Sequence, residues 1–139
     1  MTNMKYIPCS GLLFSFVMLL TIGCGPKAPY DLVLVEGVAT YAGKPIPKRF
    51  RLSFQSADGK RPSSAAIKQD DGKFVAMHTL QQDGVPKGKC QVTVVWGGDI
   101  GTSPPKEYEP MLKKYGFGTE GLELEFTKND RKFKLDFPE

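Results

Sequence analysis

The sequence has few of the residues that build catalytic and metal centres. It contains one histidine and three cysteines among 139 residues. A zinc site takes three or four ligands, and nucleophilic or acid–base catalysis needs a paired set of reactive side chains. We expect His78 to lie at a strand end without a special role and Cys90 to be a buried, inert thiol. The sequence therefore predicts a protein with no catalytic residues, no metal site and no cofactor.

A strong charge of either sign is also missing. Lysine and arginine number 19 and the acidic residues 15, so the formal net charge is only +4 at pH 7. Nucleic-acid binding usually leaves a strongly basic surface, and we predict no nucleic-acid partner. Two basic clusters remain, one containing Arg49 and Arg51 and the other containing Lys132 and Lys134. They are candidates for contact with anionic lipid or polysaccharide, and the alternative is a solvated surface.

No apolar run is long enough to span a membrane. The uncharged run at residues 11–22 falls well short of the roughly 20 residues that a transmembrane helix needs. A single cation, Lys5, precedes it, and small residues follow it. This order of a cationic start, a short apolar core and small residues is typical of a secretory signal peptide.

The signal-like segment ends at a cysteine. Residues 20–24 (LTIGC) resemble the lipobox of bacterial lipoproteins, although Thr21 stands where leucine is commonest. The resemblance implies a signal peptide over residues 1–23, an acylated Cys24, a tether over residues 24–31, and membrane lipid as a partner. It also implies an extracytoplasmic place in the cell envelope, and Gly25 favours the outer membrane over the inner. The alternatives are an ordinary cleaved signal or an uncleaved anchor, with Cys24 a plain thiol.

The rest of the chain, residues 32–139, has the alternation of short strands. Phe50, Leu52 and Phe54 alternate with polar residues, and the 15 glycines and 11 prolines indicate many turns. We predict about seven strands and an all-β sandwich. Two hairpins are expected: residues 64–68 with 73–77 across an Asp-Gly turn, and the last two strands, 122–127 and 132–137, across a turn at residues 129–130.

The strand pattern stops between residues 97 and 121, which we interpret as an insertion with a short helix at residues 109–115. Pro110 suits the first helical turn, and Gly116 can end the helix. Aromatic residues gather here, and their rings are candidates for contact with a glycan, a small ligand or a partner. The alternative is that the helix closes the open end of the sandwich. The candidate residues are Trp96, Tyr108, Tyr115 and Phe117.

Three segments resemble carboxypeptidase regulatory-like domains: residues 35–46 (VEGVATYAGKPI), 71–74 (DGKF) and 85–94 (VPKGKCQVTV). This resemblance implies an Ig-like, transthyretin-like Greek-key sandwich of the kind found in many small bacterial lipoproteins. The expected function is a non-catalytic, membrane-anchored binding or structural domain at the cell envelope, with an envelope protein or glycan as partner. The alternative is a glycan- or small-ligand-binding module that uses the aromatic region 96–117.

Overall fold

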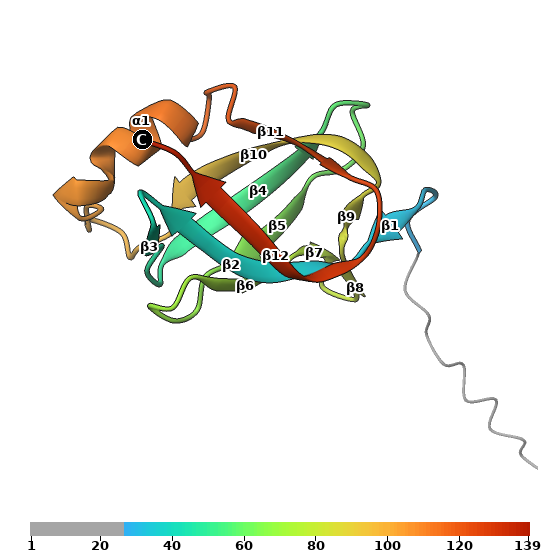
Figure 1. Cartoon of the computed structure of the whole chain (residues 1–139), viewed down its shortest axis with the longest axis horizontal. Helices are drawn as coiled ribbons and strands as arrows, with labels where there is room; N and C mark the ends of the chain where they lie inside the picture. Colours follow the sequence, from blue (N-terminus) through green and yellow to red (C-terminus); the bar gives the residue numbers. More distant parts are fainter. Residues whose placement is uncertain (1–26) are drawn as a thin grey trace, which may run out of the picture.

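The computed structural model describes residues 27–139, so the predicted signal peptide and Cys24 lie outside the described residues. Short strands make up about half of this part, which also has one short helix (Figure 1). The elements in chain order are β1 (Leu32–Val33), β2 (Val35–Tyr41), β3 (Lys44–Pro45), β4 (Phe50–Ser56), β5 (Ser63–Ala66), β6 (Lys73–Val75), β7 (Met77–Thr79), β8 (Gln82–Asp83), β9 (Val85–Pro86), β10 (Gly88–Trp96), the 3-10 turn η1 (Lys106–Tyr108), α1 (Glu109–Tyr115), β11 (Leu122–Phe126) and β12 (Asp130–Phe137).

The strands form two layers. The larger sheet has the order β11-β10-β4-β5-β7-β8, and the smaller sheet has the order β12-β2-β3, with β6 also paired to β2. A two-stranded ribbon of β1 and β9 lies at one end, and α1 lies at the other (Figure 1). The predicted all-β sandwich with one short helix is confirmed.

The core lies between the two sheets and follows the predicted alternation. Phe50, Leu52 and Phe54 of β4 are fully buried. Val35 and Ala39 of β2 face them from the smaller sheet and are also buried. Each large apolar side chain removed from water in this way stabilises the fold by about 1.5–3 kcal/mol.

The last two strands do not pair with each other, so that predicted hairpin is wrong. β11 runs antiparallel to β10, with Leu124 opposite Cys90, whereas β12 runs parallel to β2, with Leu135 opposite Ala39. The chain crosses from one layer to the other between them. Both strands alternate because each turns one face toward the shared core, and alternation does not identify the neighbouring strand.

The other predicted hairpin is only partly present. Ser64 of β5 pairs with Met77 of β7 in the larger sheet, but β6, between them in sequence, pairs with β2 of the smaller sheet. The Asp-Gly turn forms as expected, with Gly72 at a φ of 72°. The Gly72 carbonyl accepts a hydrogen bond from the amide of Ala39 at 2.8 Å, which holds the turn against β2.

Candidate functional site

The helix end of the sandwich contains two of the predicted contact residues, and both are buried. The Tyr108 ring lies 5.2 Å from that of Phe50, and the Tyr115 ring lies 5.2 Å from that of Phe137. The Tyr115 hydroxyl also donates a hydrogen bond to the Pro138 carbonyl at 2.9 Å. These rings therefore pack within the protein, and α1 closes the end of the sandwich, which is the alternative that the sequence left open.

The other two aromatic residues do not form a common surface with the tyrosines. Trp96 packs edge-on against Phe50 at 5.0 Å, and its indole nitrogen donates to the Thr102 carbonyl at 3.2 Å. Phe117 is 90% exposed. A ligand role for Trp96 and Phe117 stays a prediction, but a single exposed ring is not a stacking platform.

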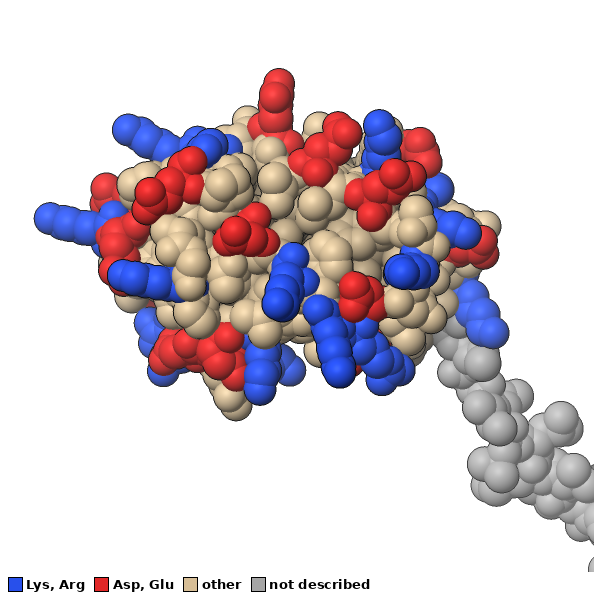
Figure 2. All heavy atoms as spheres, in the orientation of Figure 1, with Lys and Arg blue, Asp and Glu red and all other residues tan. Residues whose placement is uncertain are grey.

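The structure separates the two basic clusters. Arg51 lies on β4 of the larger sheet. Arg49 immediately precedes β4 and forms an ion pair with Asp99 at 3.7 Å. Lys132 and Lys134 lie on β12 of the smaller sheet. The four residues do not form one anionic-contact surface. Acidic and basic side chains are interspersed over the face seen in Figure 2.

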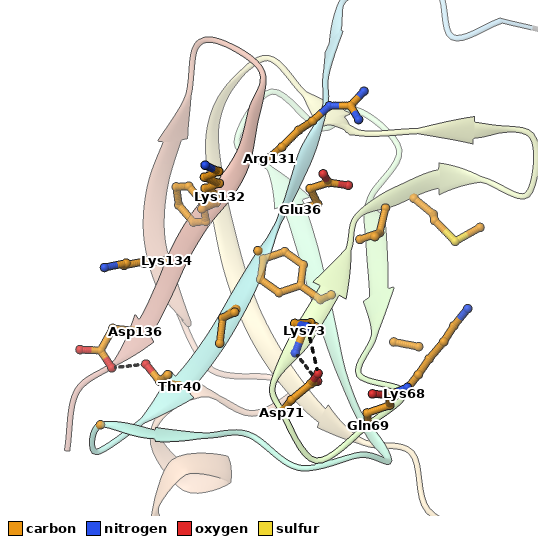
Figure 3. Close-up of a pocket in the computed structure, with 18 residues that line it drawn as sticks. Glu36, Thr40, Lys68, Gln69, Asp71, Lys73, Arg131, Lys132, Lys134 and Asp136 are labelled. Atoms are coloured by element: carbon orange, nitrogen blue, oxygen red, sulfur yellow. Dashed lines mark hydrogen bonds and ion pairs between the residues drawn. The ribbon is translucent and has the colours of Figure 1, made fainter.

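Lys132 and Lys134 border an open groove of about 1100 Å³ on the outer face of the smaller sheet (Figure 3). We call this feature the sheet groove. In the strand register Val38 of β2 lies between Lys134 of β12 and Lys73 of β6. A row of lysine, valine and lysine therefore crosses three strands. Val75, which is 47% exposed, extends the apolar part of the groove.

Cations exceed carboxylates in this groove. Its five cations are Lys68, Lys73, Arg131, Lys132 and Lys134, and its three carboxylates are Glu36, Asp71 and Asp136.

Two of the three carboxylates already have partners in the sheet groove. The Lys73 ammonium lies 3.6 Å from Asp71, and the Thr40 hydroxyl donates to Asp136 at 2.7 Å (Figure 3). Among the described residues, neither Lys132 nor Lys134 has a carboxylate within 4.0 Å. These two ammonium groups are therefore free to bind an external anion.

The single histidine lies at the opposite end from α1 and attaches the tether to the sandwich. His78 is 5% exposed; its Nδ1 lies 2.9 Å from the Ser63 hydroxyl and its Nε2 lies 3.0 Å from the Tyr30 hydroxyl. Burial, followed by the positive charge of Arg61, lowers the pKa of His78. A neutral imidazole has one donor and one acceptor, and the two hydroxyls satisfy both.

A serine hydroxyl bonded to a histidine is also half of a nucleophilic catalytic set. Here Ser63 is only 1% exposed, and neither Ser63 nor His78 lines the sheet groove. The second ring nitrogen of His78 bonds to a tyrosine, whereas a catalytic triad has a carboxylate in that place. We therefore interpret the Tyr30–His78–Ser63 chain as structural.

Cys90 does not lie in an environment that would activate its thiol. Cys90 is fully buried, its thiol lies 3.7 Å from the Pro86 carbonyl, and burial raises its pKa. Within residues 27–139, no three histidine, cysteine or acidic side chains come together as metal ligands. No helix in the same residues is long and apolar enough to cross a bilayer.

Comparison with known proteins gives no relative. No family model matches the chain, and neither a curated protein nor a solved structure matches it.

Proposed function

We propose that this protein is a bacterial lipoprotein anchored through acylated Cys24, whose β-sandwich is a non-catalytic binding module on the extracytoplasmic side of the cell envelope. We further propose that the sheet groove binds an acidic polysaccharide of the envelope. The observation that supports this binding role is the row of Lys134, Val38 and Lys73 in an open groove with more cations than carboxylates.

The chemistry of the groove suits a carboxylate-bearing sugar chain. The free ammonium groups of Lys132 and Lys134 would bind carboxylates, and the apolar side chains of Val38 and Val75 would pack against the C–H face of a sugar ring. The aromatic region 96–117 is less well supported as the ligand site, because Tyr108 and Tyr115 are buried. The lipobox-like motif at residues 20–24 supports acylation of Cys24. Two or more acyl chains on this residue would hold the protein stably on a membrane.

The proposed anchor predicts that lipidation depends on the thiol of Cys24. We expect Cys24→Ser to abolish incorporation of radiolabelled palmitate and to move the protein out of the membrane fraction. Cys90→Ala is the matched control and should retain the label, because this buried thiol is not a lipidation site. Equal labelling and equal membrane association of wild type and Cys24→Ser would disprove the anchor.

The groove predicts a charge-specific loss of binding. We expect the double variant Lys132→Gln and Lys134→Gln to bind polygalacturonate about tenfold more weakly, which corresponds to about 1.4 kcal/mol for two exposed ion pairs. The matched control is Arg49→Gln with Arg51→Gln, which removes two positive charges from β4 and the residue just before it.

Isothermal titration calorimetry at two salt concentrations measures both double variants. Weakening confined to the Lys132 and Lys134 variant, and smaller at high salt, is the expected result. An equal loss in the arginine variant would show a non-specific charge effect, and no binding by wild type would exclude this ligand class.

A further inference from the structure

The end of the sandwich opposite α1 is the end from which the tether leaves. The described part of the tether, residues 27–31, is bonded to the domain: the Ala28 amide donates to the side chain of Gln82 at 3.0 Å, and Tyr30 bonds to His78. Immediately afterwards β1 pairs with β9 (Figure 1). These contacts fix where the chain leaves the sandwich.

Covalent geometry limits how far this end can lie from the anchor. Lys27 is three residues from Cys24, and three residues span at most about 10 Å. If Cys24 is acylated, as proposed above, the β1 end of the sandwich must therefore lie against or very near the membrane surface. The helix α1 lies at the opposite end of the sandwich from β1 (Figure 1).

A leucine occupies the tip of a hairpin at this same end. Thr79 of β7 pairs with Gln82 of β8, so Leu80 and Gln81 form a two-residue turn. The Leu80 side chain is 95% exposed, and Gln82 is the residue that holds Ala28. Such turns normally carry glycine, asparagine, aspartate, serine or proline, and an exposed leucine there packs against nothing in the domain. Neither local turn chemistry nor packing within the domain explains this leucine.

We propose that the turn between β7 and β8 is a membrane-contact element, in which Leu80 inserts into the interfacial region of the bilayer that holds the acylated Cys24. The inference rests on the proposed anchor and adds a second, apolar attachment point. Two attachment points on one end of the domain fix its orientation, so that the α1 end faces away from the lipid.

Charges of both signs lie near this end of the sandwich. The Lys60 ammonium lies 5.5 Å from the centre of the Tyr30 ring and pairs with Asp58 at 3.4 Å. Arg61 is close enough to lower the pKa of His78, and Asp31 follows Tyr30 in the chain. Because both signs are present, we expect the contact to form on neutral phosphatidylcholine and to change little with salt.

The single tryptophan of the chain makes a direct test possible. In a Trp96→Phe background, Leu80→Trp places the only indole at the proposed contact, and Phe117→Trp places it at the α1 end as a matched exposed control. The full lipoprotein is reconstituted in vesicles of phosphatidylcholine with brominated acyl chains. We expect Leu80→Trp to lose most of its fluorescence and to emit at shorter wavelength, and Phe117→Trp to do neither.

The outcomes separate this inference from the proposed function. Mass spectrometry of the reconstituted protein first establishes whether Cys24 carries acyl chains; their absence overturns both proposals. An acylated protein in which Leu80→Trp is no more quenched than Phe117→Trp overturns the membrane contact and leaves the anchor standing. If Trp96→Phe weakens folding, nitroxide labels at Leu80→Cys and Phe117→Cys give the same comparison, because Cys90 is buried.

Discussion

Gly37→Ala is expected to destabilise the protein by about 4 kcal/mol or more, which is a large part of the 5–15 kcal/mol typical of a whole domain. A Cβ atom at Gly37 would lie 1.8 Å from the backbone oxygen of Phe133. This contact involves backbone on both sides, so no side-chain rotation can relieve it. The pairing of β2 with β12 would have to open where its register already shifts, between Asp130 and Phe133.

Urea denaturation measures this effect, and Gly59→Ala is the matched control. Gly59 has a φ of 71°, and a Cβ there would meet nothing within 4 Å. The Gly59→Ala variant should therefore lower the free energy of unfolding only by the strain of alanine in a left-handed backbone conformation, about 1–2 kcal/mol. A Gly37→Ala variant no less stable than Gly59→Ala would show that the two strands have room to separate.

The close approach of another strand to Gly37 could be predicted from the sequence, and so could much of the core. Alternation places Gly37 on the same face as Val35 and Ala39, where the absence of a side chain implies a close neighbour. The helix bounds also follow from local signals, since Pro110 lies in its first turn and Gly116 ends it. Each of these features depends on a few neighbouring residues, which is why a single sequence contains the information.

The pairing of the strands could not be predicted from neighbouring residues in the same way. The apolar residues of β11 and β12 alternate identically, but the two strands lie in different sheets. A hairpin of these two strands would have placed Glu125 opposite Lys134, whereas Glu125 lies opposite Lys89 of β10. Alternation specifies which face of a strand is buried, and the partner depends on how the connection crosses the core.

The candidate site depends on such long-range pairing. Lys73 and Lys134 are 61 positions apart in the chain and become neighbours of Val38 only through the register of three strands. The hydrogen bond of Tyr30 to His78 joins residues 48 positions apart. Lys132 and Lys134, which the sequence places two positions apart, lie on one strand, β12.

Tyr115→Ala should destabilise the protein by about 3–5 kcal/mol, the range for removing a large buried aromatic side chain. The Tyr115 ring is 4% exposed and packs on Phe137, and its hydroxyl bonds to Pro138. The next residue, Gly116, forms a bridge with Val94 of β10, so the helix is attached to the larger sheet as well. Loss of the ring would open the end of the core that α1 closes.

Two further variants identify the source of this loss when all three are compared by urea denaturation. Tyr115→Phe removes only the hydroxyl and its hydrogen bond, so we expect about 1 kcal/mol. Phe117→Ala removes a ring that is 90% exposed and should stay within about 0.5 kcal/mol of wild type. If α1 were a detachable flap over a ligand site, Tyr115→Ala would leave the free energy of unfolding nearly unchanged. A loss in the predicted order, with Tyr115→Ala far larger than Phe117→Ala, therefore assigns the helix to the core.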